Sequence, residues 1–321
     1  MDMLQMDLIR NNTFSVTEQN WQSDILASSV PLWAVVDGVS WPEIQSLLAE
    51  NIPPHACLYT STDPNTQRIA PWLVRVEPDS AMQALFESRD PATYSIIFFH
   101  SHKGLKQLRD HFRRYTMLLI PTIPDTPVYF RFYDPRVLMD MMTALDTYKL
   151  MLFFNGIEAF YIPNSYQLCL PNTIHIFPIP LDHVSLITDA CLAIKPAHSD
   201  QLPPHASQSF RVSHSELQCF KELMQQRQPL NLATKLYQTY QGNFSAVHYE
   251  RAAQLAVQQS SNYSIKSENE HMLLADCYLW LGPNFPANSP VAEALLSERD
   301  TKRFQRLIAW LQEEKRRIAQ G

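Results

Sequence analysis

The chain has 321 residues, of which 45% are hydrophobic and 18% are charged. This length favours two domains of ordinary size, and the apolar fraction is high enough for packed cores, which excludes an intrinsically disordered chain. The formal net charge of −6 gives no overall attraction to nucleic acid or to an anionic membrane. We therefore expect a folded protein whose partners include neither nucleic acid nor a membrane.

The sequence shows no pattern of a membrane span, a signal peptide or a disulfide framework. The longest apolar runs, such as 95–99 and 150–154, are strand-sized and much shorter than the roughly 20 residues that cross a bilayer. Residues 1–10 mix charged and apolar side chains and lack the features of a signal peptide. Five widely spaced cysteines include no Cys-x-x-Cys pair. We expect a cytoplasmic protein with free thiols.

From residue 31 to about residue 177, short apolar runs alternate with amphipathic segments, the pattern of an α/β domain. Strands are predicted at 31–36, 56–60, 72–76, 94–100, 117–120, 128–133, 159–162 and 173–177. Helices are predicted at 42–50, 80–88, 103–115 and from residue 135 onward. The expected architecture is a mixed sheet with flanking helices.

A polar stretch broken by three prolines, 195–207, then indicates a connector between domains. We place the boundary there and expect an α/β domain at 1–197 and a helical domain at 198–321. The segments after the connector have helical spacing of apolar residues, as in Phe304, Leu307, Ile308, Leu311 and Ile318. The second domain is therefore predicted to be an all-α helical bundle.

Glycine usage excludes several enzyme classes. The chain has six glycines, and their spacing forms no dinucleotide fingerprint, P-loop or Gly-x-Ser-x-Gly nucleophile elbow. Each of those sites requires glycine because backbone groups must approach the ligand closely or adopt a strained turn. No cofactor is expected.

Histidine and serine leave one catalytic alternative open. His100 and His102, at the end of a predicted strand, would share a face and could bind a metal if a third ligand came from elsewhere. Ser40, after an Asp-Gly turn, could be drawn into a hydrolase triad. The other interpretation is an ordinary strand end and an ordinary turn, and it is the one we adopt: no catalytic residue and no metal ligand are expected.

The predicted helix at 103–115 is locally basic. Lys106, Arg109 and Arg113 make it a possible docking site for an acidic partner surface. The interpretation that we favour is a solvated helix face whose apolar residues turn inward.

Residues 130–138, Phe-Arg-Phe-Tyr-Asp-Pro-Arg-Val-Leu, predict a strand followed directly by a helix. Asp134 is placed as the N-cap, and Pro135 stands at the first helical position, where its missing N–H costs nothing. Arg131, Asp134 and Arg136 are expected to form a charge-assisted network that stabilises this corner. Strand alternation puts Tyr133 on the same face as Arg131.

This segment resembles the signature Phe-Arg-x-Tyr-Asp-Pro-Arg-Val-Leu of the domain-of-unknown-function family found in type VI secretion adaptor chaperones of the Tap or Tec type. Four further stretches are similar to that family: 32–38, 70–74, 101–113 and 153–156, the last with Asn155 and Gly156 as departures. Together they place the resemblance over residues 31–163.

The resemblance implies a non-enzymatic adaptor for bacterial toxin delivery. Such a protein binds a cognate type VI effector and the VgrG spike, the signature domain being associated with the spike and the helical domain with the effector. A structural baseplate component and a hydrolase using His100, His102 or Ser40 remain as alternatives.

An adaptor needs exposed anchor residues on its binding surfaces. The helical domain offers these aromatic candidates: Tyr237, Tyr240, Tyr249, Trp280, Phe285 and Trp310. Phe285 lies in a proline-flanked loop and is the one expected to be exposed. For each of them, burial in the core of the domain is the interpretation that we favour.

Overall fold

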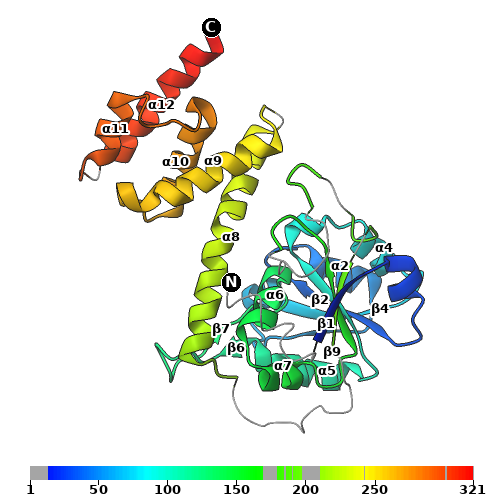
Figure 1. Cartoon of the computed structure of the whole chain (residues 1–321). Coiled ribbons are helices and arrows are strands. Elements are labelled where there is room, and N and C mark those ends of the chain that lie inside the picture. The colour runs from blue at the N-terminus through cyan, green and yellow to red at the C-terminus, as the bar shows by residue number, and fades with distance from the viewer. Residues whose placement is uncertain are drawn as a thin grey trace. The chain divides into compact units, whose positions relative to one another are not determined.

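The computed structural model describes residues 14–168, 179–183, 186–189, 191–196, 210–241, 243–300 and 302–320. They form two compact units, one built on a β-sheet and one built of helices (Figure 1). The sheet unit runs to residue 179 and includes 184–223, and the helical unit consists of 180–183 and 224–321. The α/β-then-α fold class is confirmed. The predicted boundary between 197 and 198 lies outside the described residues and stays a prediction.

The sheet unit contains a seven-stranded sheet. In spatial order its strands are β1 (Phe14–Gln19), β9 (Cys191–Pro196), β8 (Ala159–Pro163), β5 (Ile96–His100), β2 (Leu32–Asp37), β4 (Pro71–Val76) and β3 (His55–Cys57). Every neighbouring pair among these strands is antiparallel, where a mixed sheet was expected. The difference arises because alternation of strands and helices along a sequence does not fix the direction of neighbouring strands.

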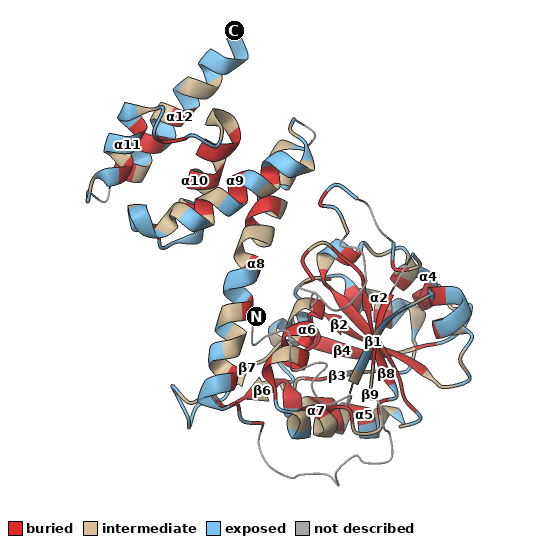
Figure 2. Ribbon diagram, viewed as in Figure 1, coloured by how far each residue is buried: buried red, intermediate tan, exposed pale blue. Residues whose placement is uncertain are grey.

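The central strands are buried on both faces (Figure 2). In β2, Trp33 and Val35 belong to one apolar cluster, and Ala34 and Val36 belong to the other. The first cluster is completed by residues of α5, α6 and α7, and the second by residues of η2, α2 and α4. A strand that is covered on both faces needs a continuous apolar run, which is why β2 and β5 could be recognised in the sequence.

The helices of this unit are η2 (Trp21–Leu26), α2 (Ile44–Asn51), α3 (Pro64–Arg68), α4 (Ala81–Glu87), η3 (Pro91–Thr93), α5 (Leu105–Phe112), η4 (Arg113–Tyr115), α6 (Pro135–Ala144) and α7 (Thr147–Phe153). Side chains cap several of them, since Ser80 accepts from the backbone of α4 and Asp146 from that of α7. α7 was not predicted. The strands expected at 117–120 and 128–133 shorten to β6 (Met117–Leu118) and β7 (Val128–Tyr129), which pair with each other. The strand expected at 173–177 lies outside the described residues.

The helical unit confirms the all-α prediction. α8 (His214–Tyr240) begins in the sheet unit, and its part from residue 224 belongs to the helical unit. It is followed by α9 (Ala246–Gln259), η6 (Ser260–Tyr263), α10 (Glu268–Leu281), α11 (Pro290–Ser297) and α12 (Arg303–Gln320). The buried side chains of this unit include Leu236, Tyr249, Leu274, Leu296 and Leu307. Within the described part of the chain, no helix combines the length and the apolar character needed to cross a membrane.

Candidate functional site

The candidate site lies at the end of β2, where the chain turns through Asp37 and Gly38. The Gly38 N–H donates to the carbonyl oxygen of Ala70 at 3.1 Å. A Cβ on Gly38 would lie 2.5 Å from that oxygen and 2.6 Å from the carbonyl oxygen of Arg68. Glycine is therefore required by the close approach of two backbone segments, and the turn is held against the residues that precede β4.

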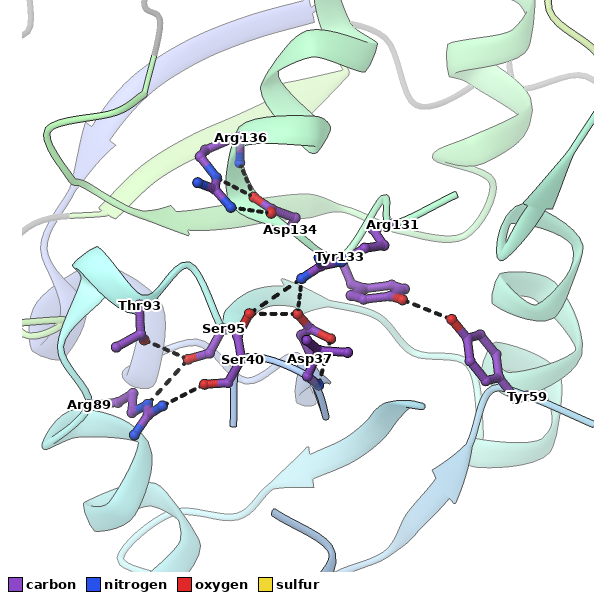
Figure 3. Close-up of polar contacts among 11 residues, drawn as sticks. Asp37, Ser40, Tyr59, Arg89, Thr93, Ser95, Arg131, Tyr133, Asp134 and Arg136 are labelled. Carbon is purple, nitrogen blue, oxygen red and sulfur yellow. Dashed lines mark hydrogen bonds and ion pairs between the residues drawn. The ribbon is translucent and has the colours of Figure 1, made fainter. Parts of the chain in front are cut away.

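Asp37 is fully buried and is the centre of the site (Figure 3). Its Oδ1 accepts from the Val39 N–H at 3.0 Å, and its Oδ2 accepts from the Ser40 hydroxyl at 2.7 Å. The Arg131 guanidinium donates through Nη2 to Asp37 Oδ2, and it also lies 3.3 Å from Ser40 Oγ. Burial lowers the pKa of Arg131, but the charges of Asp37 and Asp134 and the hydrogen bond to Asp37 together raise that pKa above its usual value. Arg131 therefore remains charged and compensates the buried carboxylate.

A second arginine fixes the other side of the turn. Arg89 Nη2 donates to the carbonyl oxygen of Ser40 at 2.8 Å, and Arg89 Nε lies 3.3 Å from Ser95 Oγ. The Asp37 N–H donates to the Ser95 carbonyl at 2.8 Å, and the Arg89 guanidinium lies 4.7 Å from the centre of the Trp41 ring. These bonds tie the turn to the segment that leads into β5.

Tyr133 connects the site to the segment after β3. The residue is 1% exposed, and its hydroxyl lies 3.1 Å from the hydroxyl of Tyr59. Burial is the main cause of the raised pKa of both phenols, so both stay neutral and act as hydrogen-bonding groups. The Tyr59 ring lies 5.2 Å from the ring of Tyr129, at the end of β7.

Asp134 caps α6 and pairs with Arg136. Its Oδ1 accepts from the Arg136 backbone N–H at 2.9 Å and from Arg136 Nε at 3.0 Å, and its Oδ2 accepts from Arg136 Nη2 at 2.7 Å. Pro135 occupies the first turn, as predicted. Arg136 also donates to Gln167 Oε1 at 2.8 Å and lies over the ring of Tyr94.

The predicted network of Arg131, Asp134 and Arg136 is thus divided into two. Asp134 and Arg136 pair as expected, but Arg131 makes its ion pair with Asp37, 94 residues earlier in the chain. The cause is local: β7 ends at Tyr129, and the Asp134 N–H donates to the Arg131 carbonyl at 2.9 Å in a turn. The strand alternation assumed for 130–133 does not apply.

The three basic residues expected to form a patch on α5 have different surroundings. Lys106 is exposed, and Arg109 forms an exposed ion pair with the next residue in the sequence at 3.1 Å. Arg113 Nη2 donates to the carbonyl oxygens of Cys57 and Tyr59 at 3.1 and 3.2 Å. Arg113 therefore covers the end of the edge strand β3 and adjoins the candidate site. Whether Lys106 or Arg109 binds a partner stays a prediction.

The expectation that Phe285 is exposed is wrong. Its side chain is 3% exposed, its ring packs edge-on against Tyr278 at 5.4 Å, and it stacks on Trp310 at 6.3 Å. The Phe285 N–H donates to the Gly282 carbonyl at 3.2 Å, so the loop folds back and places the ring between α10 and α12. Phe285 is a core residue of the helical unit.

The two histidines of the catalytic alternative are not brought together. His100 is buried and its Nδ1 lies 2.9 Å from the Tyr161 hydroxyl; burial lowers its pKa to about 4. The His102 side chain is 72% exposed and lies 3.3 Å from Glu158. Since β5 ends at His100, the expected shared face does not form. Ser40 is bonded to the carboxylate and guanidinium described above, and within the described ranges no three His, Cys, Asp or Glu side chains are grouped as a metal site.

A family model matches the part of the chain that contains this corner. Residues 32–150 match DUF4123, a domain of unknown function. The DUF4123 match covers a little over a third of the chain, from the start of β2 into α7, and includes Asp37 and Arg131. No curated protein and no solved structure matches the chain. The resemblance to a domain-of-unknown-function family is therefore supported for this segment, and the helical unit lies outside it.

Proposed function

We propose that the chain is a non-enzymatic adaptor of type VI secretion, which binds a toxic effector and loads it onto the VgrG spike in the cytoplasm. The observation that carries this proposal is the DUF4123 match together with the signature residues inside it. Those residues are engaged in structural contacts, since Arg131 compensates Asp37 and Asp134 caps α6.

The state of these side chains supports binding rather than catalysis. Asp37 already accepts from Val39, Ser40 and Arg131, and a carboxylate so engaged is a poor general base. What the corner provides is rigidity, because it joins β2, the segment before β4 and the segment before α6. A rigid surface loses little conformational entropy when a partner binds, which favours recognition.

The chain also has the organisation that an adaptor requires. The sheet unit contains the DUF4123 match, and the helical unit provides a second folded surface. By the family resemblance, the sheet unit is assigned to the spike and the helical unit to the effector.

The proposal is tested with tagged full-length protein produced in the native bacterium. We expect VgrG and one effector, encoded beside this protein, to co-purify with it and to be identified by mass spectrometry. Deletion of the gene should abolish secretion of that effector while VgrG is still secreted.

The deletion also separates the adaptor from the baseplate alternative. Loss of a structural baseplate component would stop secretion of VgrG together with every effector. Recovery of neither partner, with unchanged secretion of the neighbouring effector, would refute the adaptor proposal.

A further inference from the structure

Exposed apolar side chains gather at the end of β2, beside the buried ion pair. Val39 is 51% exposed and Ile69 is 47% exposed. They belong to neighbouring segments, because the Gly38 N–H donates to the Ala70 carbonyl. Exposed apolar residues that cluster in this way, unlike those scattered singly, are typical of interaction sites.

Aromatic groups and Arg131 continue this surface. The Arg131 side chain is 39% exposed, and its Nη1 has no hydrogen-bond partner among the described residues. Tyr129 is 65% exposed and its ring lies 5.2 Å from that of Tyr59, whose hydroxyl is bonded to Tyr133 inside the site. We call the following set the signature face: Val39, Tyr59, Ile69, Tyr129 and Arg131.

Three arginines lie at or beside the signature face. Arg68 is exposed and its carbonyl oxygen lies against the Asp37 turn, while Arg113 donates to the carbonyl of Tyr59. Of the carboxylates in these segments, Asp37 is buried and paired with Arg131, Asp63 is exposed and caps α3, and Asp125 is exposed in the loop before β7. Arg131 lies within the face, and Arg68 and Arg113 lie beside it. Among the described residues, Arg131 pairs with Asp37, whereas Arg68 and Arg113 form no ion pair with a carboxylate.

The part of the sequence that contains these arginines is acidic in total. Residues 1–223 contain 23 acidic and 15 basic residues, whereas residues 224–321 contain 9 and 11. Charge effects between exposed groups are screened beyond about 8 Å at physiological salt, so the arginines at the face decide which partner fits there. A complementary partner surface carries carboxylates among apolar side chains.

We propose that the signature face is a docking surface for an acidic, apolar surface of a partner protein. A partner carboxylate binds Nη1 of Arg131, and a partner apolar side chain covers Val39 and Ile69. The inference rests on the proposed function and narrows it, because it places one of the adaptor's two binding surfaces on named residues. Asp37 contributes by holding the guanidinium in one orientation, which reduces the entropy lost on binding. Tyrosine and arginine are also the residue types that dominate binding hot spots.

The test uses tagged full-length protein in the native bacterium deleted for its own copy, with VgrG and the neighbouring effector quantified by mass spectrometry. The variants are Ile69→Asp and Tyr129→Ala. Each should lower the recovery of one of these two partners about ten-fold or more, the effect of losing a hot-spot residue.

Two matched controls separate docking from general surface effects. Ile52→Asp changes an isoleucine that is 79% exposed near the opposite end of β3, and Tyr148→Ala changes a tyrosine that is 57% exposed on α7. Both should leave recovery within about two-fold of wild type, as expected away from a hot spot. All four positions are exposed, so the variants are expected to fold, and their circular dichroism spectra check this.

A charge reversal tests the chemistry of the partner. Arg68→Glu should lower recovery of the same partner, whereas Lys106→Glu on α5 should not. If Lys106→Glu lowers recovery while Ile69→Asp and Tyr129→Ala do not, the docking surface is on α5 and the inference is wrong. If wild type recovers both partners and all signature-face variants do so equally, the inference is wrong and the adaptor proposal stands. If wild type recovers neither partner, both fail.

Discussion

The ion pair between Arg131 and Asp37 allows a quantitative prediction about stability. Replacing Arg131 by Met keeps the length of the side chain but leaves the fully buried Asp37 carboxylate without its counter-charge. Removing one partner of a buried pair typically costs about 3–5 kcal/mol. The Arg131 side chain is 39% exposed, and Asp37 keeps its bonds to Val39 and Ser40. We therefore expect the free energy of unfolding to fall by about 2–3 kcal/mol, below the usual range because water and these donors still solvate the carboxylate.

Urea denaturation of the full-length protein, followed by tryptophan fluorescence, measures this change. Four of the six tryptophans lie in the sheet unit, so the signal reports mainly on the unit that contains the pair. The double variant Asp37→Asn with Arg131→Met should be more stable than Arg131→Met alone, because the uncompensated charge has been removed.

A matched control is Arg109→Met, because its partner Asp110 is 49% exposed whereas Asp37 is fully buried. Its loss should change the free energy of unfolding by less than about 0.5 kcal/mol. If Arg131→Met is as stable as Arg109→Met, or if the double variant shows no coupling, the pair does not hold the corner together and the reasoning is refuted.

Three further predictions concern other parts of the chain. Because burial lowers the pKa of His100 to about 4 from 6.5, the unfolded state takes up the proton first as pH falls, so stability is complete above pH 6.5 and decreases toward pH 4. The free energy of unfolding falls by at most about 2 kcal/mol between pH 7 and pH 5. His100→Gln should make the free energy of unfolding, measured by denaturation at each pH, depend less steeply on pH over this range. An unchanged pH dependence would contradict the prediction. Gly38→Ala should destabilise the protein by about 1–3 kcal/mol in thermal denaturation, because its Cβ would meet two carbonyl oxygens. Gly104→Ala, whose Cβ meets no backbone atom within 4 Å, should cost only about a few tenths of a kcal/mol. Equal losses of stability in the two variants would contradict this prediction. Phe285→Ala should lower the free energy of unfolding of the helical unit by about 3 kcal/mol in urea denaturation. Val247→Ala, at an exposed position, should lower it by less than about 0.5 kcal/mol. An equally stable Phe285→Ala variant would show that Phe285 is not a core residue.

Much of the sheet unit could be predicted from local sequence signals. The apolar runs of β2 and β5 are continuous because both faces of these strands are buried, and a continuous run is visible without knowing its partner. The start of α6 was likewise visible, since Asp134 and Pro135 are adjacent in sequence and act locally.

The centre of the candidate site could not be predicted in the same way. Arg131 and Asp37 are 94 residues apart, and nothing in the periodicity around either residue specifies the other. The Asp-Gly turn after β2 was the available signal, because it places a carboxylate at a strand end where a partner charge is required. The prediction that Phe285 is exposed was wrong for a different reason. Flanking prolines predict a loop, but they do not determine whether a loop side chain turns outward or into the core.

The central claim is that this protein connects an effector to VgrG, and the most direct measurement is a bridging experiment. VgrG is tagged in the native bacterium, and the effector that co-purifies with it is quantified with and without this protein. The account predicts that the effector is recovered with VgrG when the protein is present and is lost when it is deleted, and that supplying the protein again restores recovery. Equal recovery of the effector in the absence of the protein would contradict the account.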